Sequence, residues 1–334
     1  MITNPFDTDA FSVVELTNAI NVLPNNYGRL RRMNLMPVQG VRTRTVMIEE
    51  KNGVLNLIPS QPVGAPGTPN KTGSRKARTF AVPHLPLDGV ILPDEYDGIR
   101  AFGSEDAMAE LASIMNDHLQ GLKDKHAITL EWLRMGALKG LILNADGTTM
   151  YDLFNEFEVT QKTVNFALGT DATDVRGKCF DVLRHIEDNL QGEVYTGVHC
   201  LCSSTFMDKL INHPNVYDTF LYQSSERLRE DVRKAFDFGG IRFEEYRGQA
   251  TDIEDNTRQF IADGEAHFFP RGTRNTFSTY AAPADFMEAV NTRGKLFYAK
   301  QEPRKYNRGV DIHTQSNPLP ICRRPALLVK GTDT

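Results

Sequence analysis

Several common features are absent from this sequence. Its 334 residues include one tryptophan and four cysteines, and no two cysteines have CxxC spacing. The spacing therefore does not indicate a zinc-ribbon or thioredoxin-like redox site, and we expect buried free thiols. No apolar run reaches the roughly 18 residues of a membrane span. The N-terminal sequence MITNPFDTDAFSVVELTNAI has neither the basic start nor the apolar core of a signal peptide, so we expect a cytoplasmic protein.

Motifs of catalytic and cofactor sites are also missing. The sequence contains no GxSxG, GxGxxG or Walker loop and no Cys-His signature of a nucleophile. His199, Cys200 and Cys202 are close in sequence, but neighbours on a strand point to opposite faces and would not converge on one zinc ion. The segment NADGT at residues 144–148 lacks the first aspartate of a calcium loop and favours a turn. We therefore expect no enzymatic activity, no cofactor and no metal site.

Acidic residues are missing from residues 61–80, QPVGAPGTPNKTGSRKARTF, although the whole chain has a formal charge of −5. This cationic loop contains Lys71, Arg75, Lys76 and Arg78. Its prolines and glycines disfavour a helix or a central strand, so the loop has no core of its own. Such an arm suits a protein that grips a neighbouring copy of itself better than it suits a soluble enzyme. The net charge argues against wholesale binding of nucleic acid.

An acidic cluster follows at Asp94, Glu95 and Asp97. The favoured interpretation is a solvated turn, ahead of a metal or acid–base site. A third interpretation is an electrostatic partner for the basic residues 71–78 of another subunit. Salt bridges to nearby acids explain the basic residues near the C-terminal end more simply than nucleic acid does; these are Arg304, Lys305, Arg308, Arg323 and Arg324.

The first half of the chain predicts an arm, a hairpin and a long helix. Residues 1–40 hold scattered apolar anchors, among them Val14, Leu16 and Ile20, and should lie on another surface. TVMIEE and GVLNLI flank an Asn-Gly turn and favour a β-hairpin over residues 41–58. From about residue 104 to 139, apolar residues recur at steps of three and four. This stripe predicts a helical rod roughly 50 Å long.

The second half alternates helical and strand patterns, so the fold class is expected to be α+β. Asp174 should cap a helix that Gly192 ends, and VHCLCS should be a buried strand. SSERLREDVRKAFDF favours a helix that buries Phe236. IRFEEYRG and QFIADGEAHFFPRG look like paired strands. Residues 151–157 should be extended, and the last core strand is expected at residues 326–329.

Several long segments, in the right order, resemble one known family. They are LTNAINVLPNNYGRL, GVLNLIPSQPVGAPG, AFGSEDAMAEL, TLEWLRMGALKGLILNADGT, YDLFNEFEV, FDFGGIRFEEYRG and NPLPICRRPALLV. Together they span nearly the whole chain and resemble the lambda-like phage major capsid protein family, also called coat protein E.

The resemblance implies the Hong Kong 97-type phage capsid fold. Residues 1–40 would form the N-terminal arm and residues 41–90 the extended E-loop. Residues 91–191 and 276–334 would form the peripheral (P) domain, which contains the spine helix. Residues 192–275 would form the axial (A) domain, at the centre of each pentamer or hexamer. The arm is expected to gain order only on neighbouring subunits.

The resemblance also implies a structural function, that of the major capsid protein of a tailed double-stranded DNA bacteriophage. Pentamers and hexamers would close into an icosahedral head shell around the genome, first as a procapsid that later expands. Expected partners are other copies, scaffold and portal proteins, and a decoration or cement protein at threefold positions. Packaged DNA would be contacted only non-specifically, and no membrane is involved. The protein would reside in the virion after assembly in the host bacterial cytoplasm.

Two alternatives stay open at this point. An encapsulin-like compartment shell uses the same fold to enclose enzymes, and the other alternative is an enzyme with an unfamiliar site.

Some phages with this fold crosslink Lys to Asn between subunits, and Lys71 and Asn70 are present on the loop. Because lambda-like capsids generally rely on non-covalent contacts and decoration proteins, we expect no crosslink.

Overall fold

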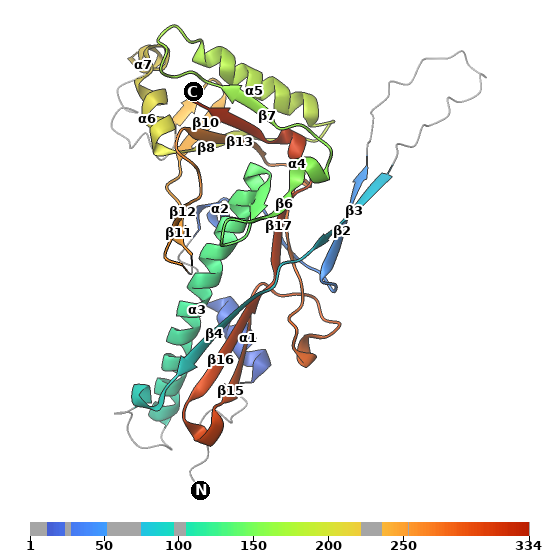
Figure 1. Cartoon of the computed structure of the whole chain (residues 1–334), viewed down its shortest axis with the longest axis vertical. Coiled ribbons are helices and arrows are strands. Elements are labelled where there is room, and N and C mark those ends of the chain that lie inside the picture. The colour runs from blue at the N-terminus through green and yellow to red at the C-terminus, as the bar shows by residue number, and fades with distance from the viewer. Residues whose placement is uncertain are drawn as a thin grey trace, which may run out of the picture. The chain divides into compact units, whose positions relative to one another are not determined.

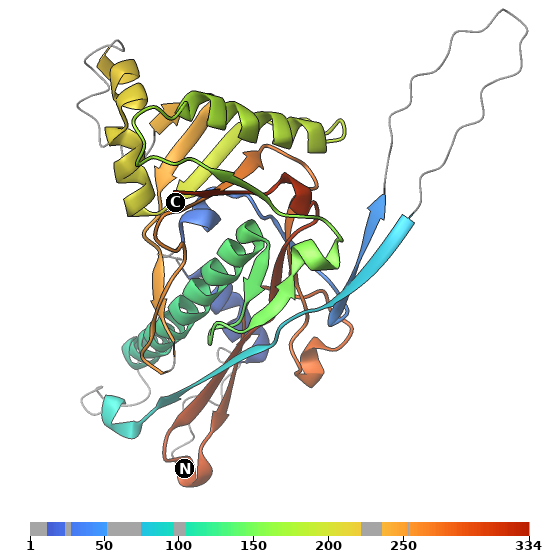
Figure 2. The ribbon, with the colours of Figure 1, turned by 45° about the horizontal axis from the view of Figure 1, so that its top comes forward.

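The structure is a computed structural model that describes residues 12–23, 28–51, 75–96, 105–221, 236–252 and 254–333 (Figures 1 and 2). The chain divides into two compact units. The first combines residues 1–46, 80–133 and 278–321, and the second combines residues 47–79, 134–277 and 322–334. Both units contain helices and strands, so the α+β class is confirmed. The expected division into arm, E-loop, P domain and A domain stays a prediction.

The first unit is built on an antiparallel sheet packed against two helices. The sheet has the order β15-β16-β4, with the strands Tyr298–Pro303, Val310–Ser316 and Leu85–Ile91. Helix α1, Val13–Val22, and the N-terminal part of α3, Glu105–Lys139, lie beside it (Figure 1). Gly89 of β4 permits this packing, because a Cβ there would lie 3.1 Å from Leu122 Cδ1 of α3.

Shorter elements complete the first unit. Helix α2 is Arg29–Arg32. Strand β1, Val38–Gly40, runs parallel to β14, Phe277–Ala281, which also pairs with β17, Pro318–Cys322. Three 3-10 turns are η2, Pro93–Tyr96, η4, Met287–Ala289, and η5, Lys305–Asn307.

The long helix α3 confirms the predicted spine. It contains 35 residues and ends before Gly140, whose φ of 79° suits a glycine that terminates a helix. The stripe residues whose burial is described are all buried, namely Met115, Leu119, Leu122, His126, Leu130, Leu133 and Ala137. The strict helical period thus follows from one continuous buried face.

The second unit is organised around a six-stranded mixed sheet (Figure 2). Its order is β7-β18-β13-β8-β10-β9, with β8 pairing parallel to β10 and antiparallel to β13. In that order the strands are Lys162–Asn165, Val329–Thr332, Glu265–Arg271, Gly197–Cys202, Ile241–Glu245 and Phe236–Phe238. The helices are α5, Val175–Asn189, α6, Ser204–Asn212, and α7, Pro214–Leu221.

The core of the second unit lies between this sheet and helices α5 and α6. Phe166 stacks on Phe268 with ring centroids 5.5 Å apart, and Phe206 meets the edge of Phe166 at 5.4 Å. Cys200 and Cys202 point into this core and, like Cys179 of α5, are fully buried. The cysteines are therefore buried free thiols, as the sequence predicted.

The remaining elements of the second unit are short. Strands β5, Leu141–Leu143, and β6, Thr149–Asp152, flank the predicted NADGT turn. Strands β11, Gln249–Thr251, and β12, Thr257–Gln259, form a hairpin, and η6 spans Pro325–Leu327. Helix α4, Leu153–Glu156, replaces the extended chain expected there, because Asp152 caps it by accepting hydrogen bonds from Phe154 N and Asn155 N.

The first strand of the predicted hairpin over residues 41–58 is present, and its predicted second strand lies outside the described residues. Strand β2, Thr45–Lys51, pairs with β3, Arg75–Ala81. The sequence RKARTFA of β3 contains no proline or glycine, so the C-terminal part of the cationic loop can continue as a strand. The Asn-Gly turn and GVLNLI lie outside the described residues.

Three further expectations in the second unit need correction. Phe236 lies on strand β9, because Gly239 and Gly240, both with positive φ, close a hairpin to β10. The rest of the helix expected from residue 224 lies outside the described residues. Strands β10 and β13 are not paired with each other, since β8 lies between them. The last strand is β18, after the 3-10 turn that Pro325 begins.

Candidate assembly site

Two basic residues of the cationic loop have described side chains, and both contact the same chain. Lys76 Nζ donates a hydrogen bond to Glu158 Oε2 at 2.6 Å. Arg78 Nε donates to the carbonyl oxygen of Glu156, and its guanidinium lies 4.8 Å from the ring centroid of Phe157. These contacts fasten strand β3 to α4 and the residues just after it.

The side chains of the other two basic residues of the loop lie outside the described part of the chain. Arg75 is the first residue of β3, and Lys71 lies outside the described residues. The role of the four residues between subunits therefore stays a prediction.

The ion pair that holds Lys76 is open to solvent. The side chains of Lys76 and Glu158 are 53% and 68% exposed. The hydrogen bond and charge of Lys76 lower the pKa of Glu158, so this carboxylate is ionised at neutral pH. Exposed ion pairs contribute little net stability because water solvates the separated charges well. A neighbouring molecule can therefore replace this contact without a large loss.

The acidic cluster forms a turn, in agreement with the favoured interpretation. Asp94 and Glu95 lie on η2, and Asp97 lies outside the described residues. Glu95 accepts a hydrogen bond from Leu92 N at 3.0 Å and contacts His118 Nε2 at 2.5 Å. The backbone hydrogen bond from Leu92, followed by the hydrogen bond and charge of His118, lowers the pKa of Glu95. A role of this cluster as acidic partner in another subunit stays a prediction.

Two buried charged residues of α3 bind the helices of the N-terminal arm, α1 and α2, and neither contact was predicted from the sequence. Lys123 Nζ donates to Leu23 O at 2.5 Å, at the carbonyl end of α1. Glu131 Oε1 accepts from Leu30 N at 2.6 Å, at the amide end of α2. Each charge has the sign that complements the helix end it meets. Both residues lie beside the predicted apolar stripe. A charged residue at the border of a buried face was the only feature of the sequence that could have indicated these contacts.

The arm is consequently ordered on its own chain. Leu16 and Ile20 are buried in the cluster formed by α3 and the β15-β16-β4 sheet. Thr17 Oγ1 and Asn21 Nδ2 donate hydrogen bonds to carbonyl oxygens of Ala299 and Phe297. The expectation that the arm gains order only on neighbours is wrong for residues 12–23. Their apolar face finds a partner in the C-terminal strands, which are distant in sequence.

Not every predicted anchor of the arm is buried. The side chain of Val14 is largely exposed on α1, so this assignment is wrong. The helical period explains the difference, because residue 14 falls on the face opposite residues 16 and 20.

Basic residues near the C-terminal end behave as predicted where their partners are visible. Arg304 Nε donates to Asp311 Oδ1 at 2.7 Å, and Arg324 Nη1 lies 3.2 Å from Glu193 Oε2. Both arginines therefore have an acid of the same unit as partner, and nucleic acid is not needed to explain them.

The candidate metal ligands separate as strand geometry requires. His199 contacts Glu244, with 3.2 Å between Nε2 and Oε2, while Cys200 and Cys202 belong to the core. Burial raises the pKa of the Cys200 thiol well above its usual range. Within the described residues, no three His, Cys, Asp or Glu side chains are grouped as a metal ion would need. None of the described helices combines the length and apolar character of a membrane span.

The sequence matches a family of virion proteins along almost its full length. Residues 12–333 match the family model described as phage major capsid protein E. The major capsid protein of Pseudomonas phage KPP10 is 33% identical over 343 residues, covering 96% of this chain and 96% of that protein. The major capsid protein of Salmonella phage Felix O1 is 27% identical over 362 residues, covering 98% of each.

Solved structures show the same fold. A protein described as a capsid protein of a prophage in E. coli CFT073 has a TM-score of 0.60 at 14% identity, covering 97% of this chain and 99% of that chain. The mature capsid of bacteriophage PhiM1 gives 0.54 at 13% identity, covering 93% and 87%. The expected Hong Kong 97-type capsid fold is therefore confirmed. Sequence and fold together place this chain in the phage major capsid protein E family, whose members are structural proteins of the virion shell and not enzymes.

Proposed function

We propose that this major capsid protein associates into pentamers and hexamers, which close into the icosahedral head shell of a tailed double-stranded DNA phage. The observation that carries the proposal is the family match over residues 12–333, together with a relative 33% identical along 96% of the chain. Assembly takes place in the cytoplasm of the host bacterium. A procapsid forms with scaffold and portal proteins and expands when DNA is packaged.

The cationic loop is the proposed contact between subunits. Lys71, Arg75, Lys76 and Arg78 lie on a segment that is fastened to its own chain through exposed groups. Acidic residues of a neighbouring copy, with Asp94, Glu95 and Asp97 as candidates, would receive these charges. A decoration protein at threefold positions would add further contacts, and packaged DNA would be met only non-specifically.

Electron microscopy of the expressed full chain tests this function. We expect closed particles, with or without a co-expressed scaffold protein. Monomers and small oligomers alone, even with scaffold present, would contradict the proposal.

The two shell functions differ in the particle that should contain the protein: a virion for the head shell, and an enzyme-filled compartment for the encapsulin-like alternative. Mass spectrometry of purified virions should find this chain as the most abundant protein. Its absence from virions, combined with particles that enclose an enzyme, would favour the compartment shell. The matching relatives, from Pseudomonas phage KPP10 and Salmonella phage Felix O1, are virion proteins and favour the head shell.

A further inference from the structure

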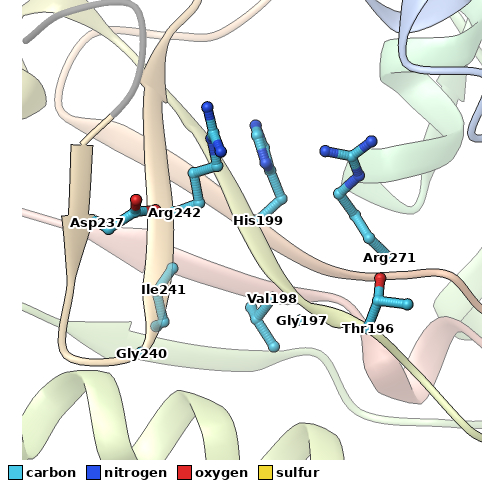
Figure 3. Close-up of a pocket in the computed structure, with 9 residues that line it drawn as sticks. All are labelled: Thr196, Gly197, Val198, His199, Asp237, Gly240, Ile241, Arg242 and Arg271. Carbon is cyan, nitrogen blue, oxygen red and sulfur yellow. The ribbon is translucent and has the colours of Figure 1, made fainter.

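A hollow lined by basic residues lies at the strand ends on one side of the six-stranded sheet in the second unit. It measures about 380 Å³ and is bounded by the start of β8, the start of β10, the end of β13 and the turn between β9 and β10. Figure 3 shows Arg242, His199 and Arg271 side by side, pointing to one face of the sheet, while Val198 and Ile241 point to the other. We call this site the arginine hollow.

Sheet register fixes this arrangement. Arg242 of β10 is directly opposite His199 of β8, and Arg271 of β13 is opposite Gly197 of β8. Gly272, with φ of 77°, allows a close approach, since a Cβ there would lie 2.5 Å from Thr196 Cγ2. The strands therefore fix the backbone positions from which the basic side chains extend, with Arg242 exposed and Arg271 half-buried.

Both arginines of the hollow have unused hydrogen-bonding capacity. Within the described part of the chain, neither guanidinium has a hydrogen bond or an ion pair. Other arginines of this unit, such as Arg258 and Arg324, do have carboxylate partners. A planar guanidinium offers five donors in a fork that fits a carboxylate or phosphate, so two unpaired forks in one hollow indicate an anion.

His199 adds a buried group without a second partner. Its side chain is 1% exposed, and Nε2 contacts Glu244 Oε2 at 3.2 Å. Nδ1 is buried and has no hydrogen-bond partner among the residues that the structure describes. Because burial lowers the pKa of His199, its ring is neutral: Nε2–H donates to Glu244 and Nδ1 is an acceptor, so the two arginines are the groups that can donate to a carboxylate here.

The surroundings favour a single carboxylate over the backbone of a nucleic acid. Asp237 lines the hollow beside Arg242 and would repel a polyanion that passes across it. Binding along nucleic acid needs a track of several cations, whereas the described lining of this hollow contains two arginines. The chain itself has 43 acidic and 38 basic residues, so copies of it present many carboxylates. We propose that the arginine hollow receives an Asp or Glu side chain from a second copy of this chain.

This inference rests on the proposed shell function, and a reconstruction of the shell tests it directly. At side-chain resolution, we expect a carboxylate of an adjacent subunit within hydrogen-bonding distance of Arg242 or Arg271. Density for a DNA phosphate in the hollow, or a hollow that faces no neighbouring protein, would overturn the proposal. Failure of the wild-type chain to form any shell would count against the proposed function instead.

A pair of double variants gives a second test. Arg242→Met/Arg271→Met retains the aliphatic stems and removes both forks, and we expect particle yield to fall at least about tenfold. Arg176→Met/Arg184→Met on α5 is the matched control and should assemble like the wild type. Thermal unfolding of the unassembled proteins separates loss of assembly from loss of folding. Normal particle yield from the hollow variant overturns the proposal, and so does normal yield of particles that retain less DNA.

Discussion

At the scale of single residues, His126 couples the stability of the first unit to pH. Its side chain is 4% exposed, and Nε2 lies 3.0 Å from Thr314 Oγ1. Burial, with a smaller effect of neighbouring His313, lowers the pKa of His126 from 6.5 to about 4. The fold therefore requires the neutral imidazole, whereas the unfolded chain takes up a proton at its ordinary pKa.

We predict that the unassembled protein loses stability as pH falls from about 6.5 to about 4. A depressed histidine pKa means that the unfolded state binds more protons in this window, so stability declines with falling pH. The pKa difference corresponds to a maximum of about 3 kcal/mol for His126. Urea unfolding at several pH values measures this slope.

A His126→Gln variant supplies the control for this prediction. Gln retains a hydrogen-bonding group but does not titrate, so the slope should be shallower by the contribution of His126. His199 and His267, whose pKa values burial also lowers, will leave a residual slope. Equal slopes in wild type and variant would show that His126 does not titrate as proposed.

At the scale of elements, strand β3 is a segment where substitutions should impair assembly without impairing folding. We predict that replacing Lys71, Arg75, Lys76 and Arg78 with Glu leaves the protein folded but reduces particle yield about tenfold or more. The exposed ion pair of Lys76 contributes little to folding, whereas reversed charges repel an acidic neighbour. Circular dichroism and particle yield by sedimentation measure the two effects.

A Glu158→Gln variant is the matched control for the loop. It removes the ion pair with Lys76 inside the chain but leaves the loop cationic, so assembly should persist. Particles formed at normal yield by the fourfold variant would disprove the contact role of the loop.

The elements also show which parts of the fold the sequence could predict. The spine helix and α5 were predicted because each follows one period along a continuous buried face. Strands β3 and β9 were missed, since the pairing partner of a strand is a non-local property. The contacts of the candidate site could not be predicted from sequence for the same reason, because they join residues that are far apart in the chain. Lys76 was singled out from sequence, but Glu158 is 82 residues away, and Lys123 meets Leu23 across 100 residues.

The arginine hollow illustrates the same limit. His199, Arg242 and Arg271 have no common motif in the sequence. They meet only because β8 lies between β10 and β13, with one parallel and one antiparallel neighbour. No pattern in the chain specifies that strand order.

At the scale of the whole molecule, we predict that the mature shell has no covalent links between subunits. Denaturing electrophoresis of purified particles should give one main band near 37.5 kDa. Bands at multiples of this mass would contradict the prediction. In that case, a Lys71→Arg variant would test whether Lys71 is the crosslinked residue, since the ladder would then disappear.

The contacts of Lys123 and Glu131 with the two arm helices have a consequence for movement of the arm. One helix grips the two arm helices at ends of opposite polarity, and the gripping residues lie on the same face about two turns apart. Displacing either arm helix along α3 would separate a buried charge from the helix end that it meets. We therefore expect the arm helices and the spine helix to shift as one body when the subunit changes shape.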